Sequence, residues 1–230
     1  WGYQGWLGHR QMDGAHIFKV WAPTARKVEL VVYESADNQA PVYRIFPMQK
    51  GDRYSHDHKE NTIGVWSVEI AEDLTGKTYH YHVSFEYRNF YTRDPYTVAT
   101  SPDGKRSAIL GADETEVAGF EVRQGKEAFW RLDNPNQAVI YEMHIRDLTK
   151  SETSGVDSQL RGTFLGACQK GTTNHLGQKT GFDYISDLGV NVVQLQPVSD
   201  RHKDYDENGE LIYNWGYDPQ NYHAPETSFS

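Results

Sequence analysis

The chain has 230 residues, a net charge of −9 at pH 7 and a hydrophobic fraction of 37%. This length suits one large domain or two smaller ones. No apolar run approaches the roughly 20 residues needed to cross a bilayer, which excludes a membrane-spanning segment. The acidic balance, with no cluster of Lys and Arg longer than a pair, argues against a nucleic-acid partner.

The single cysteine, Cys168, excludes an internal disulfide framework and is expected to be a buried or neutral thiol. The first residues lack the basic and apolar regions of a signal peptide, although a processed start would look the same. The compartment therefore stays open, with a secreted or cell-surface location favoured over a cytoplasmic one. Aromatic residues make up 13% of the chain. Flat rings suit sugar binding, and packing in a core or on a sheet is the alternative.

Residues from Gly14 to about Val83 form short apolar or alternating runs, such as KVELVVYE and TYHYHVSF, and turn formers separate these runs. This spacing is typical of an antiparallel sandwich or barrel. Trp21 and Trp66 lie within such runs, so we expect them in the core or at a domain interface. The alternation is lost from Arg93 to Leu110, which is typical of a connecting segment.

A different pattern follows from residue 137. QAVIYEMHIRDL predicts a strand with apolar residues at Val139, Ile140, Met143 and Ile145. TGFDYISDLG (180–189) predicts a short helix that ends at Gly189. VNVVQLQPV follows as a nearly continuous apolar strand, which favours burial on both faces. Strand, helix and strand together indicate a parallel βαβ unit, and in a closed parallel barrel the loops after the strands carry the chemistry.

Several of these stretches resemble a known family. FKVWAPTARKVELVVYE, GVWSVEI and TYHYHVSF resemble the carbohydrate-binding-type, immunoglobulin-like β-sandwich that precedes the barrel in starch and glycogen debranching and branching enzymes. AVIYEMHIRDLT, GFDYISDLGVNVVQLQPVSD and YNWGYDPQNYHAPE resemble type I pullulanases of the α-amylase superfamily. The resemblance implies an antiparallel β-sandwich over 1–110 and a connecting segment over 111–136. Residues 137–230 would then form the first strands of a (β/α)8 barrel that is incomplete in this chain.

The resemblance also implies hydrolysis of α-1,6 branch linkages in pullulan, amylopectin and related α-glucans, with retention of configuration. That chemistry requires two carboxyl groups about 5–5.5 Å apart. In the family the catalytic carboxylates follow the fourth, fifth and seventh barrel strands. We therefore expect no catalytic residue in this chain, no hydrolysis by the fragment alone, and a missing remainder of the barrel as its partner. The alternatives are a non-catalytic α-glucan-binding module, a glycogen branching or debranching relative, and a non-catalytic remnant.

The candidate substrate-binding residues lie in YNWGYDP, which follows the predicted strand VVQLQPV. By resemblance, Tyr217 stacks beneath the sugar ring on the non-reducing side of the cleaved bond. Asp218 is either directed into the cleft or caps a turn. Trp215 and Asn214 flank Gly216, whose missing side chain lets backbone approach a ligand closely, and Tyr213 is a weaker candidate.

Other polar residues are expected to have structural roles. Asp147, which with His144 lies at the end of the first predicted barrel strand, is expected to make a structural hydrogen bond at the rim. The residues His56 to His58 are expected to form a solvated turn rather than a metal site. No cofactor is required and no metal ligand is predicted. Calcium stays an alternative, because the acidic stretch Asp204 to Glu210 offers oxygen ligands.

Overall fold

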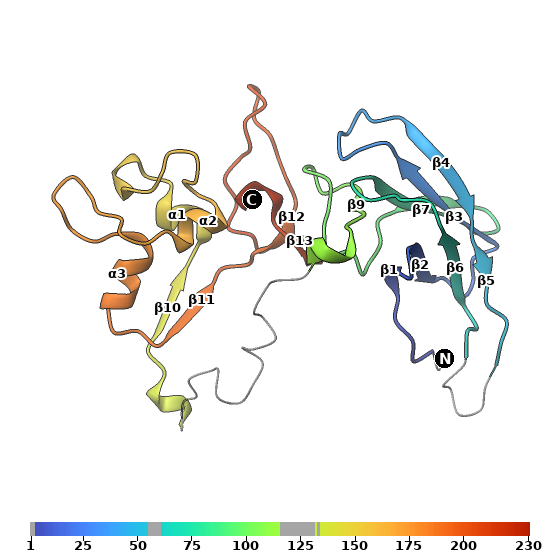
Figure 1. Ribbon diagram of the computed structural model, residues 1–230, viewed down its shortest axis with the longest axis horizontal. Helices are drawn as coiled ribbons and strands as arrows, with labels where there is room; N and C mark the ends of the chain where they lie inside the picture. The colour runs from blue at the N-terminus through green and yellow to red at the C-terminus, as the bar shows by residue number, and fades with distance from the viewer. Residues whose placement is uncertain (1–2, 55–60, 116–131, 133) are drawn as a thin grey trace. The chain divides into compact units, whose positions relative to one another are not determined.

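The computed structural model describes residues 3–54, 61–115, 132 and 134–230. The chain divides into two compact units, Trp1–Glu116 and Val117–Ser230, and each is described by itself (Figure 1). Most of the segment 111–136, which the sequence predicts to connect two domains, lies outside the described residues, as do residues 56–58 with the histidine pair.

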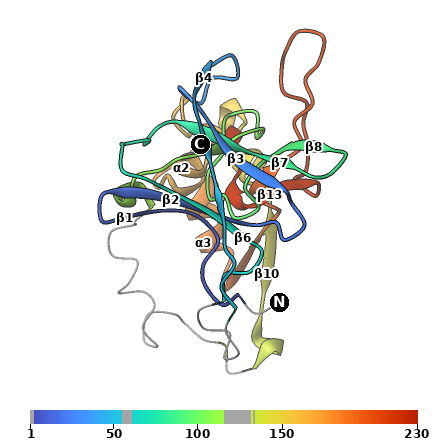
Figure 2. The same cartoon turned by 90° about the vertical axis from the view of Figure 1, so that its right-hand side faces the viewer.

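The first unit is built from two antiparallel sheets. The described strands are β1 (Gly8–Met12), β2 (Ala15–Trp21), β3 (Lys27–Tyr33), β4 (Val42–Pro47), β5 (Gln49–Lys50), β6 (Val65–Ile70), β7 (Thr78–Ser84), β8 (Asn89–Thr92) and β9 (Ser107–Ala108), followed by a 3-10 turn, η1 (Ala112–Thr115). One sheet has the order β1-β2-β6-β5 and the other β4-β3-β7-β8, with β9 added to β7. Figure 2 shows β3 and β7 side by side with β8 next to β7. The predicted antiparallel sandwich is confirmed.

Alternation along the central strands makes the core of this unit. On β3, Val28, Leu30 and Val32 are completely buried, while the residues between them point to the other face of the sheet. Tyr79 and Tyr81 of β7 enter the same hydrophobic cluster. Burial of these large apolar side chains supplies most of the stabilisation that a sandwich of this size has available.

Three expectations for this unit are corrected. Trp66 is buried and its indole donates a hydrogen bond to the carbonyl of Ala22 at 2.9 Å, but Trp21 is 44% exposed, because it lies at the last position of β2. The segment before Leu110 is not only a connection, since β9 pairs with β7. The polar strand β1, which precedes the predicted β region, joins the sheet through five residue pairs with β2.

The second unit contains a parallel strand pair with helices between the two strands. The described elements are η3 (Pro135–Gln137), β10 (Ile140–Met143), α1 (Ile145–Thr149), η4 (Glu152–Ser154), α2 (Phe164–Cys168), α3 (Gly181–Asp187), β11 (Val192–Leu195), β12 (Ser199–Arg201), β13 (Pro219–Pro225) and η5 (Thr227–Phe229). β10 and β11 run parallel, from Ile140 opposite Val192 to Met143 opposite Leu195, as the predicted βαβ unit requires. A separate antiparallel pair joins β12 to β13.

The predicted boundaries agree with the structure for the helix α3 and differ at the end of the strand β10. α3 lies within the predicted range 180–189, and Gly189, with φ +74°, follows its last turn. Ile145, expected on the strand, is instead the first residue of α1, because His144 caps that helix with its Nδ1 atom. Cys168 is exposed rather than buried, since it ends α2.

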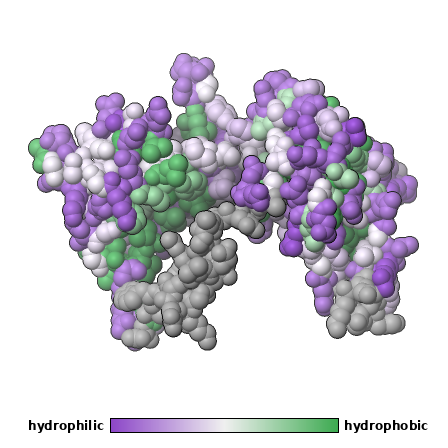
Figure 3. All heavy atoms as spheres, in the orientation of Figure 1, coloured by the Kyte–Doolittle hydropathy of each residue, from purple (hydrophilic) through white to green (hydrophobic). Residues whose placement is uncertain are grey.

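The strand β11 departs from its predicted environment. Its nearly continuous apolar sequence favours burial on both faces, yet Val193 is 45% exposed and Leu195 43%. On the neighbouring strand β10, Ile140 is 58% exposed. Apolar residues gather visibly on this unit around these strands (Figure 3). A small buried cluster of Ile145, Ala167 and Phe229 forms the core of the unit, and Met143 at the end of β10 packs against it.

Candidate functional site

The five predicted substrate-binding residues lie together in one loop. The loop runs from residue 202 to residue 218 between β12 and β13, and residues 213–218 form its second half.

Tyr213 packs against the start of α1. Its hydroxyl group donates a hydrogen bond to Asp147 Oδ2 at 2.6 Å, and the Arg146 guanidinium lies 5.3 Å from the centre of its ring. Partial burial, followed by the hydrogen bond to Asp147, raises the pKa of Tyr213 above its usual value. The ring also lies 5.6 Å from that of His144. The structural hydrogen bond predicted for Asp147 is therefore confirmed, and its partner is the candidate loop.

Tyr217 reaches the parallel strand pair. Its hydroxyl group donates to Glu142 Oε1 of β10 at 3.0 Å, and this bond raises the pKa of Tyr217. The Tyr217 side chain is still 61% exposed and that of Trp215 is 62% exposed, so both rings are accessible to a ligand. The sequence patterns did not indicate Glu142, because a lone carboxylate in an apolar strand carries no motif.

The turn itself is cross-linked by Asn214. Its Oδ1 accepts the N–H of Gly216 at 2.7 Å, and its Nδ2 lies 3.0 Å from both carboxylate oxygens of Asp218. Gly216 has φ +95°, and a Cβ atom there would lie 2.7 Å from the carbonyl oxygen of Pro197. Only glycine adopts this backbone conformation and this close approach without strain. The polar pair of Asn214 and Asp218 therefore holds the two exposed rings on a defined turn.

These contacts define what the loop is able to do. Two exposed rings on a cross-linked turn offer flat apolar faces of the kind that stack on pyranose rings. The neighbouring carboxylates of Glu142, Asp147 and Asp218 each accept a hydrogen bond from a side chain of the loop. The site is thus suited to binding a neutral, hydroxyl-rich ligand.

The acidic stretch before the loop tip forms a turn. Asp206 Oδ1 accepts the backbone N–H groups of Asn208 at 2.8 Å and Glu210 at 2.9 Å, and these bonds lower the pKa of Asp206. Within the described ranges, no three His, Cys, Asp or Glu side chains form a group suited to a metal ion. The longest helix in those ranges, α3, has seven residues, and none is long and apolar enough for a membrane span.

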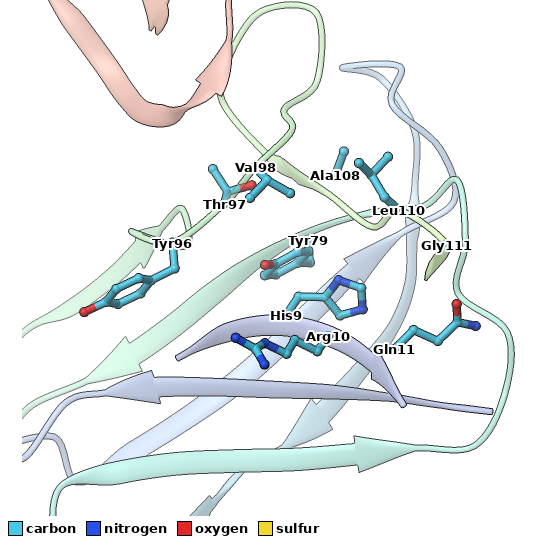
Figure 4. A pocket seen from close by; sticks show the side chains of 10 residues that line it. All are labelled: His9, Arg10, Gln11, Tyr79, Tyr96, Thr97, Val98, Ala108, Leu110 and Gly111. Atoms are coloured by element: carbon cyan, nitrogen blue, oxygen red, sulfur yellow. The ribbon is translucent and has the colours of Figure 1, made fainter. Parts of the chain in front are cut away.

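The sandwich unit has a cavity of about 300 Å³ (Figure 4). His9, Arg10 and Gln11 of β1 line one side of it, and Leu110 lines the other. His9 Nε2 lies 2.9 Å from His16 Nδ1, and burial, reinforced by the neighbouring His16, lowers the pKa of His9 to about 4. His9 is therefore neutral at physiological pH.

The outer face of the five-stranded sheet carries rings and a cation. Tyr91 of β8 is 63% exposed and stacks on His82 of β7, with ring centres 4.5 Å apart at 11°. Beyond them, Tyr33 meets His80 edge-on, and the Arg106 guanidinium lies 3.6 Å from the centre of the Tyr33 ring. These five side chains, from Tyr33 to Arg106, are called the sheet-face cluster below.

Comparisons with known proteins agree with these features. Residues 7–97 match the family described as carbohydrate-binding module 48 (isoamylase N-terminal domain). The chain is 29% identical over 228 residues to a pullulanase of Bacillus subtilis (strain 168), a match that covers 99% of this chain and 28% of that protein. It is 26% identical over 243 residues to isoamylase 1 of Oryza sativa subsp. japonica, covering 97% of this chain and 28% of that protein.

A solved structure resembles the chain along its whole length. The D350A mutant of the pullulanase from Paenibacillus barengoltzii, complexed with maltotriose, is 36% identical with a TM-score of 0.83, covering all of this chain and 34% of that one. The chain thus spans about a third or less of the length of these relatives. The predicted resemblance to pullulanases is confirmed, and within the sandwich residues 7–97 are similar to a carbohydrate-binding module.

Proposed function

We propose that the chain is the N-terminal part of a pullulanase-type enzyme that hydrolyses α-1,6-glucosidic linkages of branched α-glucans with retention of configuration. The observation that carries this proposal is the loop of residues 213–218, which presents the exposed rings of Trp215 and Tyr217. Tyr213 anchors this loop on α1, and Tyr217 anchors it on β10. Its similarity over the full length of the chain to a pullulanase complexed with maltotriose supports the same substrate class.

In this proposal, residues 1–110 are the sandwich module and residues 137–230 begin a (β/α)8 barrel. Residues 111–136 connect these two parts. The parallel pair of β10 and β11, with α1, α2 and α3 between its strands, supports a barrel start. The exposure of Val193 and Leu195 supports it as well, because later barrel strands and helices would cover such residues. The nucleophile and the acid/base carboxyl are assigned to that later part, so the chain alone hydrolyses nothing.

In this proposal the loop residues have separate roles, which their contacts support. Tyr217 stacks on a glucose ring, where its π-cloud favours the partly cationic transition state. Trp215 adds a second stacking face. Tyr213 orients the loop through Asp147, and Asn214 with Asp218 keeps the turn closed while offering polar contacts to sugar hydroxyl groups.

The test uses the full-length gene product with pullulan as substrate. Release of maltotriose is expected, and Tyr217→Ala should lower kcat/KM by at least about tenfold, as loss of a stacking contact worth about 1.4 kcal/mol would do. The matched control is Tyr222→Ala, which removes another exposed ring, 71% accessible, on β13. A product that leaves pullulan intact and transfers glycogen chains would assign the protein to the branching enzymes instead.

A second candidate function is α-glucan binding by the sandwich itself, and the sheet-face cluster favours it. An exposed Tyr91 backed by His82 presents one free ring face, as a sugar-stacking platform requires. Calorimetry of the chain with maltoheptaose should give a dissociation constant that weakens several-fold in Tyr91→Ala. The control is Tyr87→Ala, a ring that is 90% exposed and outside the cluster. Equal binding by both variants would remove this function.

A further inference from the structure

The loop of residues 202–218 begins and ends at an irregular strand pair. Ser199 lies opposite Pro225, Asp200 opposite Asn221 and Arg201 opposite Pro219, so two steps along β12 correspond to six along β13. Pro219 also has no N–H to donate. The backbone ladder at the base of the loop is therefore interrupted, and other interactions have to fix the register.

Charged side chains fill this gap. Lys203 Nζ lies 2.5 Å from Asp200 Oδ1 and 3.2 Å from Glu226 Oε1, so one ammonium group joins β12 to the residue that follows β13. The Lys203 side chain is 3% exposed, and those of Asp200 and Glu226 are fully buried. Such burial is rare for these residue types unless the charges are paired.

The remaining oxygen atoms of the two carboxylates are also bonded. Asp200 Oδ2 accepts from Asn221 Nδ2 at 2.6 Å. Glu226 Oε2 accepts the backbone N–H of Arg201 at 3.1 Å, taking the place of a carbonyl of the partner strand. The Arg201 side chain is 2% exposed, so two buried cations balance two buried carboxylates.

Stability alone does not account for this arrangement. Well-packed apolar residues in place of a buried ion pair usually stabilise a protein as well or better, because the charges lose their hydration. Ion pairs and hydrogen bonds are directional, so they favour one arrangement of the two strands over others. Here they determine where the two ends of the loop meet, at the hydrogen bond of 3.2 Å from the His202 N–H to the Asp218 carbonyl.

We propose that Lys203, bound between Asp200 and Glu226, is a positioning residue that holds the loop of residues 213–218 in its glucan-binding conformation. The proposal rests on the function proposed above. Lys203 touches no ligand itself. It fixes the register of β12 against β13, and through that register it sets the place of the Tyr217 ring.

The test compares variants of the full-length gene product on pullulan. Lys203→Met should raise KM by about tenfold, since binding energy is lost when the ring is out of place. Partial unfolding would lower the amount of active enzyme and the apparent kcat, and it would leave KM unchanged. The control is Lys179→Met, which removes an exposed lysine paired with Asp187 at 2.6 Å in the same unit. That variant should keep the wild-type KM.

A charge-balanced variant covers the case in which Lys203→Met does not fold. Lys203→Met/Glu226→Gln leaves one carboxylate and one guanidinium buried, and it should regain the melting temperature but keep the raised KM. A double variant with Tyr217→Ala gives a second readout. Lys203→Met should cost less than about twofold in that background, because it acts through the missing ring.

The outcomes separate this proposal from the proposed function. A wild-type KM in the charge-balanced variant would overturn the positioning role alone. So would a double variant in which Lys203→Met and Tyr217→Ala each raise KM by the same factor as they do separately. If the wild type binds maltotriose in calorimetry without cleaving pullulan, the proposed hydrolysis fails. The positioning role is then judged by whether Lys203→Met weakens that binding about tenfold. A wild type that neither cleaves nor binds overturns both.

Discussion

At the scale of single residues, Gly216 carries the most specific local requirement. Its φ of +95° and the close approach of the Pro197 carbonyl oxygen are two separate reasons for the absence of a side chain. A methyl group would meet a backbone atom, which is unable to rotate away. The conformation of the candidate loop therefore depends on this residue.

Gly216→Ala is expected to lower the free energy of unfolding of the second unit by roughly 2–4 kcal/mol, from left-handed strain plus overlap with Pro197. Gly209→Ala is the matched control, because Gly209 has φ +81° but no heavy atom within 4 Å of the added Cβ. It should cost only about 1 kcal/mol. Urea unfolding of the two variants measures the difference, and equal losses would contradict the contact with Pro197.

Some residues of the candidate site are predictable from the sequence and others are not. The sequence predicts the rings at 215 and 217 through a short aromatic, glycine and proline motif and its resemblance to a known family, and the structure places both rings in one exposed turn. Lys203 was not found. Its partners are Asp200 and Glu226, and a charge 23 residues away becomes a neighbour only once β12 and β13 have paired.

At the scale of elements, the histidine pair of β1 and β2 makes the edge of the sandwich sensitive to pH. His16 Nε2 lies 3.2 Å from the Leu74 N–H, which it accepts, and 3.4 Å from Asp73 Oδ1. We assign the His16 proton to Nδ1 on the shorter of these contacts, so that Nδ1 donates to His9 Nε2. Protonation of His9 would place two N–H groups against each other. With His16 in this tautomer, the pair favours a neutral His9, in line with the lowered pKa of His9.

This arrangement predicts acid destabilisation of the sandwich. Because burial lowers the pKa of His9 to about 4 in the folded state, the full stability is present above about pH 6.5. Up to about 3 kcal/mol is lost as the pH falls from 6.5 toward 4. Urea unfolding at pH 7 and pH 4.5 should show this loss in the wild type and much less of it in His9→Phe. His175→Phe, at an exposed position, should keep the wild-type loss.

The type of an element is predictable where its hydrophobic pattern has the period of a strand and one face of that strand is buried. KVELVVY alternates because β3 lies between a core and a second face, and the predicted strand is confirmed. β1 was missed because GHRQM is polar and gains its place by pairing at an edge. The predicted burial of β11 on both faces is wrong for this structure, because an apolar sequence does not say which neighbours cover it and this strand pairs with β10 alone among the described strands.

At the scale of the molecule, the exposed strand pair of the second unit distinguishes the isolated chain from the proposed longer enzyme. Val193→Lys should lower the fluorescence of a hydrophobic dye bound to the 230-residue chain, because it interrupts an apolar surface. In the full-length product the same change should destabilise the barrel by several kcal/mol, since it would bury an unpaired charge.

The loss of stability in the full-length product is the decisive observation. Val42→Lys, at a 47% exposed position on the edge strand β4, is the control and should change little in either context. If Val193→Lys is equally neutral in the full-length product, the strand pair has no covering partner there and the barrel proposal fails.

The turn at Asp206 has a practical consequence. Its backbone bonds are internal, from Asp206 N–H to the Glu210 carbonyl and from Gly209 N–H to the Asp206 carbonyl, and the residues from 204 to 210 are exposed. Lys203, with its ion pairs to Asp200 and Glu226, lies before this turn in the chain and outside residues 204–210. A peptide tag or fluorophore grafted between Glu207 and Asn208 would thus report on the candidate loop of residues 213–218 from close range, while the ion pairs of Lys203 stay intact.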